Sequence, residues 1–172
     1  VGLVSTALKT GACGHMTRKM VFAAQYKGIG GILAAQAVGE RLTQQTLSAF
    51  HSGGVLLNKK DTEKFKAVQR IFNWPITKSK DGKKEQNGWT KEKFLKELTD
   101  LLGTDLLEEH INLLWEVIYD SRDKKGGSSI TTAALRSQTF ASIGFERAKD
   151  KIISLMKNGN EIHFQDPFSK VM

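Results

Sequence analysis

Four residues of one segment carry side chains that could act together on a small polar ligand. Gln44, Leu47, Ser48 and His51 stand at positions i, i+3, i+4 and i+7 of the sequence. If the segment is helical, these positions share one face, because three- and four-residue steps return to the same side of an α-helix. Such a face combines an amide, an apolar platform, a hydroxyl and an imidazole that can donate a proton near neutral pH. A surface histidine near a helix end, with no ligand, is the alternative that the spacing leaves open.

The segments around this face predict a helical hairpin that could swing as a lid. One helix is expected over 32–50 and a second over 62–74, where Pro75 ends it. Glycine permits backbone conformations that other residues avoid, so glycine-rich joints at both ends of the first helix are candidate hinges. The proposed hinge residues are Gly28, Gly30, Gly31, Gly53 and Gly54.

The positive charge of the chain is concentrated near its N-terminus. The formal net charge is +8 over 172 residues, and residues 1–60 carry seven basic side chains against one acidic side chain. Such a concentration favours a polyanionic partner, most often a nucleic acid. A basic protein without such a partner is the alternative that charge alone leaves open.

Several other classes of protein lack their characteristic residues here. The single cysteine, Cys13, excludes an internal disulfide framework and a cysteine-rich zinc site, and we expect it to be a small core residue rather than a nucleophile. The sequence has no Walker loop, paired-histidine motif or Gly-x-Ser-x-Gly elbow, and its four histidines lack metal-ligand spacing. No apolar run approaches the roughly 18 residues of a membrane span, so no membrane partner is expected. Because the chain starts at Val1, we expect a processed or incomplete chain.

The remaining chain is predicted to be mainly α, with a small α+β segment at its C-terminus. Apolar residues recur at helical steps along most of the chain, and β-branched or alternating runs are short. The first expected element is a helix over 1–26, bent at Gly11 and Gly14. After the lid hairpin, we expect a polar connection over 76–89 and then an αα-hairpin, whose helices are capped by Thr90 and Thr104 and separated by Gly103. The last expected elements are a strand over 128–134, a helix over 145–157 and a strand over 161–165.

Three groups of residues, in this order along the chain, carry a family resemblance. They are Ala7-Leu8-Lys9-Thr10 with Gly14-x-Met16-Thr17-Arg18-Lys19; then Gly31-Ile32-Leu33-Ala34-Ala35-Gln36-Ala37-Val38-Gly39-Glu40 with Thr43-Gln44, Thr46-Leu47 and Phe50-His51-Ser52-Gly53-Gly54; then Leu135-Arg136-Ser137, Phe145-Glu146 and Asn158-Gly159. The second group strongly resembles the trigger loop of the largest (β′-type) subunit of multisubunit DNA-directed RNA polymerases. The first group resembles the end of that subunit's bridge helix, and the third, more weakly, resembles its C-terminal segment.

This resemblance implies a division of the chain into four parts within a multisubunit assembly. They are the C-terminal half of a bridge helix over 1–27, a trigger-loop helical hairpin over 28–75, a linker and αα-hairpin insert over 76–125, and a β′ C-terminal segment over 126–172. The implied partners are β-like and β′ N-terminal-like subunits. The first two motifs almost fuse between Gln25 and Gly31. This favours a divergent, phage-encoded form in the cytoplasm of a bacterial host or packaged in the virion, and removal of residues from the numbering is the alternative.

The resemblance also implies roles for individual residues in nucleotidyl transfer. His51 would approach the β-phosphate of the incoming NTP as a positional or acid catalyst, and Leu47 would pack on its base. Gln44 would lie near the ribose and Ser48 near the triphosphate. Residues along the template DNA or the RNA–DNA hybrid would be Lys9, Thr10, Arg18 and Lys19.

The sequence departs from the family pattern at several points. Arg41-Leu42 replaces a Pro-Gly or Pro-Ala pair, Ser48 stands where relatives carry Arg or Asn, and His15 replaces a common Tyr. The family's metal-binding motif of three aspartates is absent, so the catalytic Mg²⁺ would be held by another chain or by a missing part of the subunit, and no metal ligand is predicted here. The competing hypothesis is a non-catalytic, basic helical protein that binds nucleic acid or a polymerase.

Overall fold

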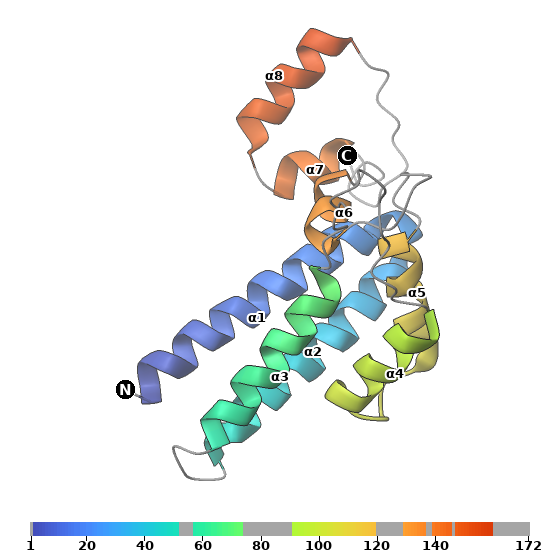
Figure 1. Cartoon of the computed structure of the whole chain (residues 1–172). Coiled ribbons are helices and arrows are strands. Elements are labelled where there is room, and N and C mark those ends of the chain that lie inside the picture. Colours follow the sequence, from blue (N-terminus) through green and yellow to red (C-terminus); the bar gives the residue numbers. More distant parts are fainter. Residues whose placement is uncertain are drawn as a thin grey trace, which may run out of the picture.

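The computed structural model describes residues 2–51, 57–73, 91–119, 129–136, 139–145 and 147–159 (Figure 1). Every regular element in these ranges is a helix, which confirms the prediction of a mainly α chain. None of the helices in these ranges is both long and apolar enough to cross a membrane. In chain order the elements are α1 (Gly2–Ala24), the 3-10 helix η1 (Gln25–Lys27), α2 (Ile29–His51), α3 (Leu57–Phe72), α4 (Lys91–Leu102), α5 (Glu108–Tyr119), α6 (Ile130–Arg136), α7 (Thr139–Phe145) and α8 (Ala148–Asn158).

The two longest helices, α1 and α2, form the centre of the molecule. They make the most extensive helix–helix contact, and α3 and α5 pack against α2 (Figure 1). The short helices α6 and α7 pack on α1, and α8 lies beyond α7 at one end of the molecule. The predicted αα-hairpin is therefore present as α4 and α5, placed beside α2.

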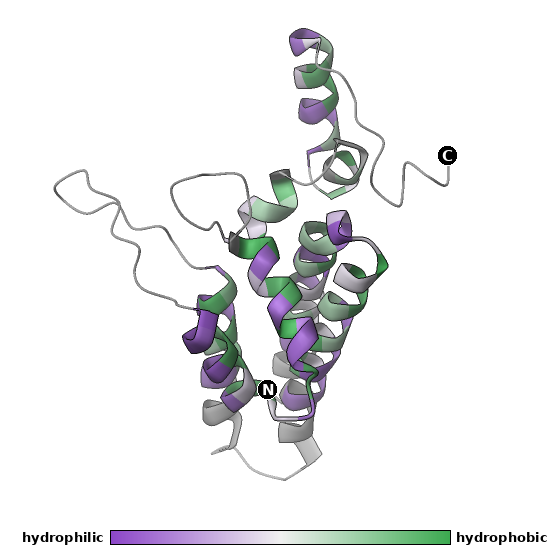
Figure 2. Ribbon diagram, turned by 90° about the vertical axis from the view of Figure 1, so that its right-hand side faces the viewer, coloured by the Kyte–Doolittle hydropathy of each residue, from purple (hydrophilic) through white to green (hydrophobic). Residues whose placement is uncertain are grey.

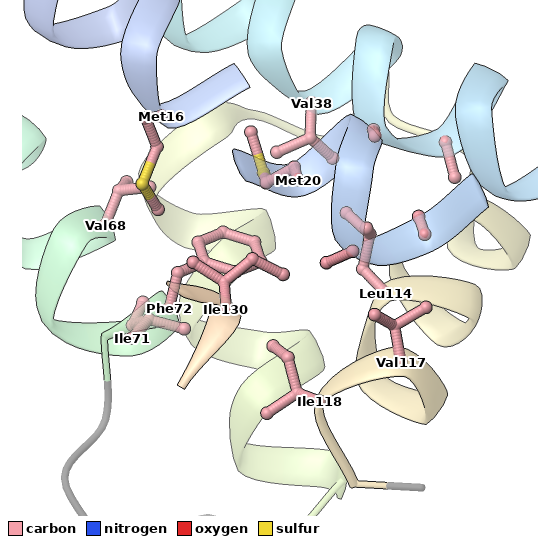
Figure 3. Close-up of a cluster of buried hydrophobic side chains, with 14 of the residues drawn as sticks. Met16, Met20, Val38, Val68, Ile71, Phe72, Leu114, Val117, Ile118 and Ile130 are labelled. Atoms are coloured by element: carbon pink, nitrogen blue, oxygen red, sulfur yellow. The ribbon is translucent and has the colours of Figure 1, made fainter. Parts of the chain in front are cut away.

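In the described part of the chain, the hydrophobic core takes side chains from each of the helices α1 to α7. Figure 3 shows its buried side chains converging from α1 (Met16 and Met20), α2 (Val38), α3 (Val68, Ile71 and Phe72), α5 (Leu114, Val117 and Ile118) and α6 (Ile130). Aromatic contacts extend this core to α4, because the ring of Phe94 lies 5.7 Å from that of Phe72 and 5.2 Å from that of Trp115. Removing these large apolar side chains from water is the main favourable contribution to the fold.

Two glycines allow α1 and α2 to approach each other closely. A Cβ atom at Gly39 would lie 2.9 Å from Thr17 Cβ and closer still to Thr17 Oγ1. A Cβ atom at Gly31 would overlap the carbonyl oxygen of Ala24. The absence of a side chain at both positions therefore sets the distance between the two helices.

The joint between α1 and α2 contains fewer residues than predicted. Of the three glycines predicted to form this joint, only Gly28 has a positive φ, of 76°, which favours glycine, and its N–H donates to the Gln25 carbonyl at 2.9 Å. Gly30 and Gly31 are already part of α2, which begins at Ile29. The predicted hinge residues Gly53 and Gly54 lie outside the described residues.

Helix boundaries elsewhere differ from the prediction at several points. α3 begins at Leu57, five residues before the expected start, because no glycine or proline interrupts residues 57–72. α4 ends before Gly103 as predicted, and Gly103 has a φ of 98°. The prediction that Thr104 caps the next helix was wrong, since α5 begins only at Glu108. Thr90 and the connection over 76–89 lie outside the described residues.

The predicted strand over 128–134 was wrong, because this segment contains the helix α6. The hydroxyl of Ser129 accepts the backbone N–H of Thr132 at 3.3 Å, which is the usual interaction of an N-cap residue. Ile130 and Ala134 are fully buried, and α6 packs against α1. The cap and the packing together outweigh the low helix propensity of the β-branched residues. The predicted strand over 161–165 lies outside the described residues.

The helix predicted over 145–157 is present as α8, which begins only at Ala148, whereas α7, over Thr139–Phe145, was not predicted. Arg147, between them, adopts the left-handed conformation with a φ of 54°. α8 ends at Gly159 as predicted, with the Gly159 N–H donating to the Leu155 carbonyl at 3.2 Å. α8 carries both hydrophobic and hydrophilic residues (Figure 2), and Met156 is among its exposed side chains.

The close approach of α1 and α2 predicts opposite effects for two glycine-to-alanine substitutions. Gly39→Ala should lower the free energy of unfolding by about 1–3 kcal/mol, because Thr17 must move to accommodate the new methyl group. Gly14→Ala should raise it by about 1 kcal/mol, because a Cβ there meets nothing within 4 Å and alanine favours the helix. Urea unfolding of the full chain measures both, and equal stability of the two variants would contradict this account.

Candidate functional site

The exposed side of α2 forms a stripe along the helix. Its members repeat at four- and three-residue steps and are all exposed: Ile29, Leu33, Gln36, Glu40 and Gln44. The amide of Gln44 donates to the Glu40 carboxylate at 3.1 Å, which places the Gln44 side chain on this stripe. The other side of α2 is buried against α1.

The backbone of α2 continues without a break to His51. Leu47 and His51 therefore occupy helix positions three and seven residues beyond Gln44, in register with the exposed stripe. Ser48 occupies the position next to Leu47. The helical spacing expected from the sequence is thus present in the backbone, although the side chains of these three residues lie outside the described part of the chain. Their roles stay predictions.

The basic residues of α1 differ in their surroundings. Lys9 and Lys19 are half-buried, whereas Thr10 lies on the exposed side of the helix with Gly11 and Gly14. Within the described residues, Lys19 has no hydrogen-bond or ion-pair partner. Contact of these side chains with nucleic acid stays a prediction.

Arg18 has a role within the chain that the sequence did not reveal. Its Nη2 donates to the backbone carbonyls of Gly144, at 3.1 Å, and Phe145, at 2.7 Å. Its guanidinium carbon also lies 5.6 Å from the ring centroid of Phe22 and 5.5 Å from that of Phe145. The last turn of α7 has no basic residue of its own, so Arg18 supplies the positive charge that favours a helix C-terminus. Arg18 therefore attaches α7 to α1.

Two ion pairs attach the α4–α5 hairpin to α2. Lys27, just before α2, pairs with Glu116 of α5 at 3.1 Å. Arg41 pairs with Asp105, in the loop between α4 and α5. Asp105 and Glu116 were missed in the sequence analysis because no local pattern links residues that are 64 and 89 positions apart.

The described residues do not form a metal centre. No three histidine, cysteine, aspartate or glutamate side chains in the described part of the chain come together in a way that could hold a metal ion. Cys13 is buried in the core, as the sequence predicted. The site is therefore an exposed helical stripe with a supporting framework of helices.

Comparison with known proteins relates this arrangement to one family. The family model described as RNA polymerase Rpb1, domain 5, matches residues 26–113, which include α2, α3 and α4. The DNA-directed RNA polymerase subunit beta′ of Herpetosiphon aurantiacus is 48% identical over 50 residues, which are 29% of this chain and 3% of that protein. The corresponding subunits of Chloroflexus aggregans and Chloroflexus aurantiacus are each 46% identical over 50 residues, with the same shares.

The chain thus spans about 3% of the length of the curated relatives that it matches. No solved structure matches it.

The contacts of Arg18 predict that two neighbouring cations differ in their effect on stability. Arg18→Met should lower the free energy of unfolding by about 1–2 kcal/mol, because two carbonyls at the end of α7 lose a charged donor. Lys19→Met, the matched control, should change it by no more than about 0.5 kcal/mol. Urea unfolding of the full chain provides the comparison. An equal loss in both variants would mean that the α7 contact is not what stabilises the chain.

Proposed function

The chain belongs to the family of RNA polymerase Rpb1, domain 5, and from this premise we propose that it provides the trigger loop of a β′-type subunit of a DNA-directed RNA polymerase. In this proposal α2 and α3 form the lid that closes over the incoming nucleoside triphosphate. α1 is the end of the bridge helix, beside the template. The whole assembly catalyses nucleotidyl transfer during transcription, and this chain contributes only part of its active site.

The observation that carries the proposal is the exposed stripe of α2. The stripe lies within the matched residues and leads in register from Gln44 to His51. Towards its other end it carries the exposed apolar residues Ile29 and Leu33. A helix that is buried on one side and presents an ordered row of polar groups on the other suits a lid, since the row can meet a ligand without disturbing the core.

Each residue of the distal part of α2 has a distinct role in the proposed lid. Leu47 packs on the base of the incoming nucleotide, Gln44 lies near its ribose, and Ser48 faces the triphosphate. The imidazole of His51 approaches the β-phosphate and donates a proton or a hydrogen bond to the pyrophosphate leaving group. Closure that succeeds only on a matched nucleotide would contribute to fidelity as well as to rate.

The surface of α1 supports a position next to nucleic acid. Gly11 and Gly14 are exposed and place no side chain on the surface at their own positions, and a Cβ atom at either position would meet nothing within 4 Å. A nucleic-acid backbone could therefore approach the helix closely there. Lys9 and Lys19 supply positive charge for phosphate contacts. Arg18 acts mainly within the chain, through its contacts with α7.

The proposed reaction requires Mg²⁺, which the described residues of this chain do not fit. They contain no group of carboxylates that could hold the ion. We assign the metal to another chain of the assembly or to another part of the same subunit, and the roles given to α2 do not depend on its position. The proposed partners are accordingly β-like and β′ N-terminal-like subunits, with template DNA, the RNA–DNA hybrid and nucleoside triphosphates as ligands.

A histidine substitution in the assembled complex tests the proposal. In a complex purified through this chain, His51→Ala should slow nucleotide addition at saturating substrate by about 10²-fold, because an acid catalyst typically contributes that much or more. Binding of the template should be unchanged. Single-nucleotide addition, followed by rapid quenching, and a template-binding assay measure the two quantities.

The matched control is His110→Ala, which removes a half-buried histidine of α5 instead of one on α2. It should leave nucleotide addition unchanged. A wild-type rate for His51→Ala would remove the catalytic role of His51. If the chain instead purifies without any polymerase chain and lacks nucleotide addition altogether, the competing hypothesis of a non-catalytic binding protein is preferred.

A further inference from the structure

Helix α5, together with the loop that precedes it, runs along α2 in the opposite direction. Three contacts show this arrangement. As the residue number rises along α2 and the turn before it, the residue number of the partner in α5 and its preceding loop falls. Lys27 meets Glu116, Gly30 lies against Leu113, and Arg41 meets Asp105. Figure 1 shows α4 and α5 beside α2. The hairpin therefore accompanies α2 from its start to Arg41.

Arg41 lies at the C-terminal end of α4. An ideal Cβ atom at Gly103, the residue that follows α4, would be 3.7 Å from Arg41 Nη2 and 3.9 Å from Nε. α4 has no basic residue in its own last turn. The guanidinium therefore meets both the Asp105 carboxylate and the partial negative charge of a helix C-terminus.

This contact is placed where α2 leaves the core. Leu42 is 2% exposed and is the last buried side chain among the described side chains of α2. Beyond it Thr43 and Gln45 are half-buried and Gln44 is exposed. The Arg41–Asp105 pair thus ties the hairpin to α2 at the point where the segment 43–51 begins.

We propose that Asp105 and Arg41 form a clamp through which the α4–α5 hairpin holds the base of the segment 43–51 and stabilises its helical form. The clamp acts on the helical form of the segment 43–51. Any effect of the clamp on nucleotide addition rests on the proposed function of α2 as a lid. Both residues are positioning residues, because they act on the segment through the backbone of α2. The hairpin thereby acquires a role in setting how often the segment is folded and ready to close.

The clamp is expected to be weak enough to open repeatedly. The side chain of Asp105 is 76% exposed and that of Arg41 is 27% exposed. Ion pairs with this exposure change an equilibrium by about two- to five-fold, and dissolved salt screens them. Because Asp105 is so exposed, replacing its charge should not disturb the packing of the core.

Hydrogen exchange of the full chain tests the clamp without any activity assay. Asp105→Asn should lower the protection of the backbone amides over 43–51 by about two- to five-fold, because the helical form of the segment loses its tie to the hairpin. Arg41→Met should have the same effect, and the double variant should show no further loss. Raising the salt concentration to about 1 M should bring the wild type close to Asp105→Asn.

The matched control is Glu116→Gln, which removes the other ion pair between the hairpin and the start of α2. It should leave the protection of residues 43–51 unchanged, and the amides of α1 should be unaffected in every variant. Equal protection of residues 43–51 in wild type and Asp105→Asn would overturn the clamp. So would an equal loss in Glu116→Gln, since the effect would then belong to the hairpin as a whole.

Nucleotide addition by the assembled complex separates the clamp from the proposed function. If α2 is the lid, Asp105→Asn should slow addition at saturating substrate by the same two- to five-fold, and Glu116→Gln should not. Loss of protection with an unchanged rate supports the clamp and counts against the lid. Unchanged protection overturns the clamp, whatever the result for His51→Ala.

Discussion

Where α2 crosses α1, a glycine of one helix meets a threonine of the other with no space for a side chain between them. This contact of Gly39 with Thr17, together with that of Gly31 with the Ala24 carbonyl, fixes the distance between the two longest helices. The other core helices pack onto this pair, α3 and α5 mainly on α2 and α6 mainly on α1. The packing contacts on the buried side of α2 therefore set the direction in which its exposed stripe faces.

Cations from other elements lie at the C-terminal ends of three helices. Arg18 donates to the carbonyls at the end of α7, Lys151 donates to the Leu135 carbonyl near the end of α6 at 3.1 Å, and Arg41 lies at the end of α4. A helix C-terminus carries partial negative charge and unpaired carbonyls, so each contact joins two elements as well as stabilising one. Part of the positive charge that indicated a polyanionic partner is thus used within the fold.

These features together connect the proposed lid to the rest of the chain. α2 is one helix from Ile29 to His51, so its first half, packed on α1 and tied to α5, is continuous with the segment that carries Gln44 and His51. In the proposed function, movement of that segment would be resisted by the core up to Leu42 and by the α4–α5 hairpin through Arg41. The hairpin would then adjust the lid without contacting nucleotide.

The sequence by itself determined most of the helices and the spacing along α2. Helical periodicity and the glycines at 103 and 159 predicted most elements, because these signals act within a few residues of each other. It could not determine that residues 130–136 are helical, since their β-branched residues favour a strand until Ser129 caps the helix and Ile130 packs on the core. Nor could it assign the partners of Arg18 and Arg41. Only the tertiary structure decided these, because it brings together residues 127 and 64 positions apart, over which no local pattern extends.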